Sequence, residues 1–392
     1  MLINLRNALM AGKRLPYDAE VEYLESTRTQ YIDTGVSDVT SSSSLNAVFQ
    51  YTQLGSSICA FGQNYGFRGN LVQMYTSSRL EFYGTGNATV LTSSGIQDKH
   101  EIQVTTNGVV FDGINIAATT LSSEPSVSMC LFSANNGVKK SSCRIYYFRL
   151  ETGTRNIDLI PVRVGQVGYL YDRVSGKLFG NAGTGDFVLG PDVVPVEWLQ
   201  SSGTQWIDTG VVPAANDTYT VETRKNNASQ DNASFGLAGC VYCFSNGFAG
   251  TGYGTFWGHP AVGLGGTAEV NPLGDTNWHT IVASPTSVSI DGVALGYRTS
   301  DAQSPLSTVK IFARGNNSAS GGVAKQYNGM ISRVFVNRGG SDLRKFYAVR
   351  VGTDATSWEG AMMDVLTRRI YRNDGTGAFG YGNGLKYPIP AS

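Results

Sequence analysis

The sequence predicts an all-β protein built from two tandem antiparallel β-sandwiches. Three observations support this fold class. A segment of sixteen residues occurs twice, at 21–36 and at 196–211. Glycines number 48, and charged residues make up 15% of the chain against an average of about 25%, a composition typical of short strands joined by tight turns. Apolar and polar residues alternate in many short runs, whereas neither half shows a sustained 3.6-residue apolar period with helix caps.

The repeat is the most informative feature. Residues 21–36 read VEYLESTRTQYIDTGV and residues 196–211 read VEWLQSSGTQWIDTGV, with eleven of sixteen positions identical. Two of the differences exchange Tyr for Trp, which predicts that these rings are buried in both copies. The spacing of 175 residues is too long for a solenoid repeat and fits a whole domain.

Three further landmarks recur in the same order. A histidine precedes an Asp-Gly pair by twelve residues in each half. An apolar-Phe pair then precedes two asparagines, and an Asn-x-Gly-Thr-Gly-x-Phe segment closes each half. These landmarks are His100 with Asp112–Gly113, Leu131–Phe132 and 181–187 in the first half, and His279 with Asp291–Gly292, Ile311–Phe312 and 373–379 in the second. Their order indicates that the chain is a duplication.

Strand signals fill the space between the landmarks. Residues 101–104 and 288–291 alternate apolar with polar, the period of a strand with one wet face. Runs rich in β-branched and aromatic residues occupy 144–150 and 331–336, and 169–179 reads as a hairpin. Many short strands at regular spacing favour a sandwich or jelly roll.

These signals divide the chain into five parts. They are an N-terminal segment at 1–20, a first domain at 21–190, a short Pro-containing linker at 191–195, a second domain at 196–384 and a tail at 385–392. The first segment is mildly basic and carries a few apolar residues that cannot form a core alone. We expect it to be an anchor that packs on another copy of the chain or on a neighbouring protein; the alternative is a disordered or self-packed leader.

Composition excludes several classes of partner. Thirty basic residues balance thirty acidic ones, and no dense basic patch exists to bind nucleic acid. No segment is apolar for the roughly 18 residues that a membrane span requires, so we expect no membrane insertion. The five cysteines form an odd, unsymmetrical set, which predicts reduced thiols rather than a disulfide framework. Cys240 and Cys243 form a CxxC without a second pair, so no metal site is expected from them.

The repeated motifs carry a family resemblance. The aromatic-His strand, the interval of twelve residues and the Asp-Gly turn resemble the laminin-G-like branch of the concanavalin A-like lectin and glucanase superfamily. The opening ES-x-x-TQ-Y-I-D-T-G and the closing N-x-G-T-G-x-F resemble a variety found in gut bacteria and their phages. The resemblance covers nearly all of 21–384 and implies two jelly-roll domains. It says little about the ligand, because one such fold serves many functions.

Sugar binding needs an exposed aromatic plate flanked by amide and carboxylate groups. In the second half, Tyr242, Asn246, Tyr253 and Trp257 lie in a glycine-rich stretch that meets this description. In the first half, the corresponding candidates are Asn64, Tyr65 and Arg68. The alternative is that these aromatic residues fill the interior of the sandwiches.

Catalytic and metal-binding chemistry has weaker support. Glucanases of this superfamily use two carboxylates about 5 Å apart on one strand face. The one comparable run, Glu20-Val-Glu22-Tyr-Leu-Glu25, lacks the central Asp, and Gln200 replaces Glu25 in the second copy. His100 and His279 occupy equivalent positions, which favours a structural role. The Asp33–Gly35 and Asp208–Gly210 segments read as turns; their carboxylates could alternatively bind calcium.

These observations favour a non-enzymatic protein without a cofactor. The resemblance implies a bacteriophage virion protein, part of a fibre or decoration, whose sandwiches attach the particle to host or mucosal glycans. Such a protein would be made in the host cytoplasm and join other virion proteins through 1–20, and we expect a homo-oligomer. The alternative is a secreted bacterial lectin or carbohydrate-binding module, located extracellularly or on the cell surface.

Overall fold

The computed structural model describes most of both halves of the chain. The described residues are 15–63, 69–92, 94–123, 127–226, 233–238, 241–244, 256–257, 275–284, 287–295, 304–324, 326–352 and 357–383. They form β-strands joined by turns and include no α-helix. Within them, therefore, no helix has the length and hydropathy needed to span a bilayer.

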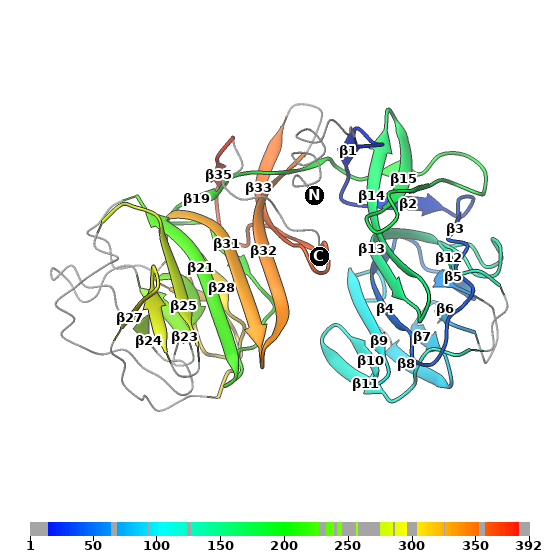
Figure 1. Ribbon diagram of the computed structural model, residues 1–392, viewed down its shortest axis with the longest axis horizontal. Coiled ribbons are helices and arrows are strands. Elements are labelled where there is room, and N and C mark those ends of the chain that lie inside the picture. The colour runs from blue at the N-terminus through cyan, green and yellow to red at the C-terminus, as the bar shows by residue number, and fades with distance from the viewer. Residues whose placement is uncertain are drawn as a thin grey trace.

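The first domain consists of two antiparallel sheets packed face to face (Figure 1). The larger sheet has the order β11-β10-β9-β4-β13-β14-β15-β16, with β1, β2 and β17 paired at its side; the smaller has the order β3-β12-β5-β6-β7-β8. The strands are β1 (Ala19–Glu20), β2 (Leu24–Thr27), β3 (Ile32–Asp33), β4 (Ser44–Tyr51), β5 (Ile58–Gly62), β6 (Leu71–Thr76), β7 (Arg79–Tyr83), β8 (Asn87–Thr92), β9 (His100–Thr105), β10 (Gly108–Phe111), β11 (Ile114–Ala117), β12 (Cys130–Leu131), β13 (Ser142–Glu151), β14 (Asn156–Val164), β15 (Val167–Asp172), β16 (Leu178–Phe179) and β17 (Val188–Leu189).

The second domain repeats this plan. Its larger sheet has the order β27-β26-β25-β21-β31-β32-β33-β34, with β18, β19 and β35 at its side; the smaller contains β20-β28-β22-β23-β24 with β29 and β30. The strands are β18 (Val193–Pro195), β19 (Leu199–Ser202), β20 (Ile207–Asp208), β21 (Asp217–Lys225), β22 (Ala233–Leu237), β23 (Val241–Phe244), β24 (Phe256–Trp257), β25 (His279–Ala283), β26 (Val288–Ile290), β27 (Val293–Leu295), β28 (Lys310–Ile311), β29 (Arg314–Gly315), β30 (Val323–Ala324), β31 (Asn328–Arg338), β32 (Ser341–Gly352), β33 (Trp358–Asp364), β34 (Ile370–Tyr371) and β35 (Gly380–Tyr381).

The equal strand orders confirm the predicted fold class, two tandem antiparallel β-sandwiches. The landmarks take equivalent places: β9 and β25 begin at the two histidines, and β13 and β31 contain the two aromatic runs. Each domain has its own apolar core between its sheets, centred on residues such as Phe49, Phe61 and Phe148 in the first and Tyr219, Phe235 and Phe346 in the second. The domain boundaries drawn from the sequence stay a prediction.

The repeated opening motif stabilises each sandwich through one buried polar network. The Ser26 hydroxyl donates to the Gln30 side-chain oxygen at 3.2 Å, and Ser201 does the same to Gln205 at 2.9 Å. The backbone N–H that follows each serine donates to the same glutamine oxygen at 2.8 Å. Buried polar groups need such partners. The serine and glutamine therefore occur in both copies because both sandwiches need this network.

The aromatic members of the motif are less buried than expected. Tyr23, Tyr31, Trp198 and Trp206 are all partly exposed, and the fully buried side chain beside Trp198 is Leu199. Adjacent strand residues point to opposite faces. Because Leu24 and Leu199 enter the cores, the neighbouring rings lie on the outer faces of the sheets.

The N-terminal segment is joined to the first domain at its described end. Ala19–Glu20 (β1) pairs with β14, and β18 pairs with the equivalent strand β32. Tyr17 is buried beside Tyr171. Residues 1–14 lie outside the described residues, so the anchor hypothesis for 1–20 stays a prediction for that part.

Candidate functional site

The structure brings together two of the aromatic candidates. Tyr242 in β23 and Trp257 in β24 are direct partners in an antiparallel pair. When the strand pairings of the two smaller sheets are compared, Tyr242 and Trp257 correspond to Leu71 and Tyr83 of the first domain, which are also direct partners. Leu71 and Tyr83 belong to a small cluster separate from the main core. The other candidates, Asn246, Tyr253, Asn64, Tyr65 and Arg68, lie outside the described residues.

The glutamate run forms ion pairs. Glu25 accepts from Arg144 at 2.7 Å within the first domain. Glu22 binds Lys99 at 3.0 Å and Arg372 of the second domain at 2.6 Å, and Glu20 pairs with Arg368 of the second domain. All three carboxylates are therefore engaged in ion pairs.

The two histidines have equivalent partners, as the structural interpretation requires. Nδ1 of His100 lies 2.7 Å from Asp112 Oδ2, and Nδ1 of His279 lies 2.7 Å from Asp291 Oδ2. Each aspartate also accepts the backbone N–H of the residue after the histidine, at 2.8 Å. Asp112 and Asp291 have φ near 50°, a left-handed conformation that Asp tolerates in turns. Each pair therefore joins the start of β9 or β25 to the turn that connects the next two strands, β10 to β11 or β26 to β27.

The candidate calcium turns differ between the domains. In the second, Asp208 Oδ2 lies 2.5 Å from the Lys310 ammonium, which is 3% exposed. The first domain has Cys130 where the second has Lys310, and Asp33 accepts from the Ser128 hydroxyl. Within the described part of the chain, no three His, Cys, Asp or Glu side chains gather as metal ligands would. Calcium at these turns stays untested.

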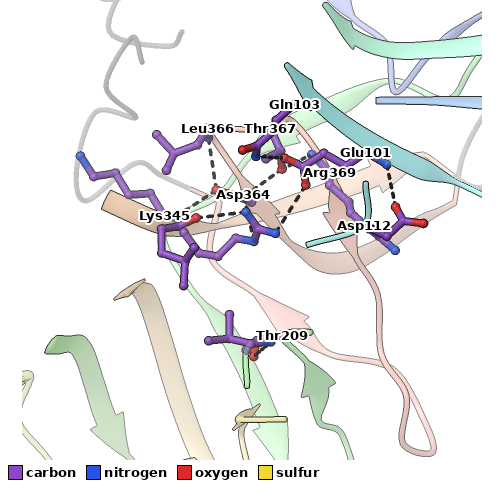
Figure 2. Close-up of polar contacts among 12 residues, drawn as sticks. Glu101, Gln103, Asp112, Thr209, Lys345, Asp364, Leu366, Thr367 and Arg369 are labelled. Atoms are coloured by element: carbon purple, nitrogen blue, oxygen red, sulfur yellow. Dashed lines mark hydrogen bonds and ion pairs between the residues drawn. The ribbon is translucent and has the colours of Figure 1, made fainter. Parts of the chain in front are cut away.

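A feature that the sequence interpretation missed is the junction between the domains. The larger sheets of the two domains face each other there (Figure 1). Three ion pairs cross the junction: Arg368 with Glu20, Arg372 with Glu22, and Arg344 with Glu101 at 3.4 Å. Figure 2 shows Glu101 and Gln103 of the first domain beside Asp364, Thr367 and Arg369 of the second.

A pocket of about 390 Å³ opens at this junction. Glu101 and Asp112 of the first domain line one side, and residues of the second domain line the rest, among them Asp208, Arg369, Tyr371 and Asp374. The Arg369 guanidinium lies over the Tyr371 ring, 5.5 Å from its centroid. This pocket, the "first junction pocket", combines one aromatic side chain with several planar polar groups.

The charges of the first junction pocket are largely balanced. Glu101 pairs with Arg344, Asp208 with Lys310, and Arg372 with Glu22 and Glu359. Asp374 and Arg369 form no ion pair with another described residue, and their charges are opposite. The pocket is therefore polar, and its lining has four carboxylates, of Glu101, Asp112, Asp208 and Asp374, and three guanidiniums, of Arg344, Arg369 and Arg372.

Two aspartates of the pocket have pKa values shifted in opposite directions. Burial raises the pKa of Asp374 above its usual value, and the negative charge of Asp208 adds to this. Burial also acts to raise the pKa of Asp208, but hydrogen bonds from Lys310 and Thr308 outweigh it and lower the net pKa. The backbone N–H of Asp208 donates to Asp374 Oδ2 at 2.8 Å, which fixes the two residues relative to each other.

The second domain contributes charged residues to the junction at positions where the first domain has glycine or alanine. By the spacing of 192 residues between Asn181 and Asn373, Arg368 replaces Gly176, Arg372 replaces Gly180 and Asp374 replaces Ala182. Gly176 has φ of 74°, and Arg368 retains the left-handed conformation with φ of 58°. A left-handed arginine is uncommon, so the surrounding contacts must hold it in place. Charged residues at glycine positions in one copy were the signal in the sequence for this site.

Comparisons with known proteins give similarity of fold. No protein-family model and no curated protein matches the chain. Among solved structures, domains LG4-5 of the mouse laminin alpha1 chain are 12% identical, cover 96% of this chain and 97% of their own, with a TM-score of 0.27. A candidate carbohydrate-binding protein from Bacteroides ovatus is 12% identical, covers 96% of each chain and has a TM-score of 0.31. The two antiparallel β-sandwiches that the resemblance implies are confirmed by the strand orders of both domains.

Proposed function

We propose that the protein is a non-enzymatic glycan-binding protein that attaches to surfaces. The observation that carries this proposal is the first junction pocket. Its volume falls in the range of about 300–1,000 Å³ that is usual for ligand sites. Carboxylates and guanidiniums accept and donate hydrogen bonds to hydroxyls, while the Tyr371 ring offers an apolar face. These are the groups that a sugar requires, and their nearly balanced charge favours an uncharged ligand.

The paired aromatic positions Tyr242 and Trp257 add a second place for sugar contact in the same domain. Their register aligns them with a cluster of the first domain that lies apart from the main core.

The non-enzymatic part of the proposal rests on the ion pairs of Glu20, Glu22 and Glu25. One observation favours the opposite view, since opposed pKa shifts such as those of Asp374 and Asp208 are typical of an acid and a nucleophile. Asp208, however, is held by Lys310, Thr308 and the backbone N–H of Gly210. We therefore assign both carboxylates to ligand binding.

For the biological setting, we propose a bacteriophage virion protein, in a fibre or a decoration, that forms a homo-oligomer and binds host or mucosal glycans. The support is the sequence resemblance of the opening and closing motifs. The second candidate, a secreted bacterial lectin or carbohydrate-binding module, rests on the same motifs. Detection of the protein in purified particles by mass spectrometry would separate the two.

The binding proposal is tested on a glycan array with wild type and two matched variants. Asp374→Ala gives the second domain the residue that the first domain has at that position, Ala182, and should lower array signals at least tenfold. Asp186→Ala is the reciprocal control, because position 186 corresponds to Ala378, and it should bind as wild type does. Absence of binding by wild type would contradict the proposal, as would equal binding by the two variants.

Catalysis is tested separately by release of reducing sugar from mucin and β-glucan. We expect none. Release by wild type that Asp374→Asn abolishes would show that the junction is a glycosidase site instead.

A further inference from the structure

A second pocket lies at the same junction. It has a volume of about 350 Å³, and Arg344 lines both pockets. Its walls also come from both domains, with Asn46, Gln103 and Arg149 from the first and Asp342 and Thr367 from the second. We call it the second junction pocket.

One strand connects the two pockets. Glu101, Gln103 and Thr105 are alternate residues of β9, so they lie on one face, about 7 Å apart from one to the next. Glu101 lines the first pocket, and Gln103 and Thr105 line the second. The Gln103 amide donates to Glu101 Oε1 at 2.6 Å, so amide and carboxylate form one continuous polar wall (Figure 2).

The second junction pocket contains hydrogen-bonding atoms without partners. Asn46 Oδ1 and Arg344 Nε are both buried. Within the described residues, Asn46 Oδ1 accepts no hydrogen bond and Arg344 Nε donates none. Asp364 Oδ2 lies 3.6 Å from Arg344 Nε, beyond hydrogen-bonding distance. A buried polar group without a partner is destabilising. Both atoms are enclosed by the protein, so a ligand hydroxyl would reach them only after the surrounding side chains shift.

The charged side chains of this pocket are paired, as in the first. Arg149 binds Glu151, and Asp342 binds Lys345 at 2.5 Å. The Ser44 hydroxyl donates to Glu151 at 2.9 Å. What remains for a ligand is amide, hydroxyl and guanidinium hydrogen bonding, which fits an uncharged sugar.

We propose that the two junction pockets are adjacent subsites of one groove, which binds an uncharged linear glycan chain across both domains. Arg344 lies between the subsites and contacts the chain on both sides. This inference rests on the proposed glycan-binding function and extends it from a single sugar to a chain. Because each subsite takes walls from both domains, neither domain alone should bind the chain with full affinity.

The test uses immobilised malto-, cello-, xylo-, manno- and chito-oligosaccharides of one to six units. We expect wild type to bind one series, with the signal rising at least tenfold from the monosaccharide to the tetrasaccharide. Asn46→Ala and Gln103→Ala should each flatten this rise. Asn107→Ala, at an exposed turn of the same domain, serves as the control and should retain it. Thermal unfolding of each variant checks that it is folded.

The outcomes separate the two proposals. No binding to any of the series, together with none on the broader array, overturns both. Binding in which mono- and tetrasaccharide signals are equal overturns the groove and leaves glycan binding intact. A rise with chain length that survives both Asn46→Ala and Gln103→Ala also overturns the groove.

Discussion

The ion pair of Arg368 and Glu20 offers the sharpest test of the junction. Both side chains are 7% exposed, and they come from different domains. Replacing Arg368 with Met keeps most of the side-chain volume and removes the charge. Glu20 would then be a buried carboxylate without its cation.

The expected magnitude follows from that burial. Removing one partner of a buried pair costs about 3–5 kcal/mol, because the remaining charge stays desolvated. Opening the junction costs less free energy than leaving Glu20 buried without a cation, because each domain has its own core and Glu20 is then hydrated again. We therefore expect Arg368→Met to open the junction rather than to unfold either domain. The measured loss of stability in Arg368→Met therefore cannot exceed the free energy that holds the two domains together.

Small-angle X-ray scattering and hydrogen exchange distinguish these responses. Arg368→Met should increase the radius of gyration and speed exchange in β1 and β32, while amides of β4 and β21 in the two cores stay protected. The double variant Arg368→Met with Glu20→Gln also removes the unpaired charge of Glu20, so its radius of gyration should return close to that of wild type. If the single variant keeps the wild-type radius and exchange pattern, the ion pair does not hold the domains together.

Three other predictions concern the rest of the chain. Burial acts to raise the pKa of Glu22, but Arg372 and Lys99 outweigh it and lower the net pKa, so its stabilising effect is present above about pH 4.3 and is lost as the pH falls through the lowered value. The difference in unfolding midpoint between wild type and Glu22→Gln should therefore shrink below pH 4. A Cβ on Gly183 or Gly375 would lie 2.1 Å from a backbone oxygen, so Ala at either position should destabilise its own domain by about 1–3 kcal/mol in denaturant melts, whereas Gly153→Ala should not. Deleting 1–14 should leave the melting of both domains unchanged and abolish self-association measured by light scattering; normal assembly would refute the anchor.

The fold was predictable because the duplicated residues are those that the fold needs. Ser26 and Gln30, with their counterparts Ser201 and Gln205, form the same buried network in both copies. The positions where sequence reasoning was less successful follow from strand geometry. Trp198 directly precedes the core residue Leu199 of β19 but its ring takes the opposite face, and shared aromatic character does not reveal which face is buried.

The junction could not be found by looking for what the copies share. Strand β1 reads Ala-Glu and its counterpart β18 reads Val-Val-Pro, so their common pairing leaves no trace in the sequence. The charged hairpin residues 368, 369, 372 and 374 belong to a segment whose counterpart holds Gly176, Lys177, Gly180 and Ala182. A search for differences at equivalent positions would have drawn attention to them.

These same differences make the two sides of the junction unlike. The second domain docks on the first through unlike surfaces, and such a head-to-tail contact between similar units continues indefinitely unless one surface is lost. The first domain lacks the docking arginines, since Gly176 and Gly180 stand in their places. The second domain lacks two of the three acceptors: by the spacings of the repeats, Pro195 replaces Glu20 and Thr280 replaces Glu101, while Glu197 retains the charge of Glu22. The two domains therefore cannot exchange places at the junction, and its two pockets depend on the order in which the two copies stand in the chain.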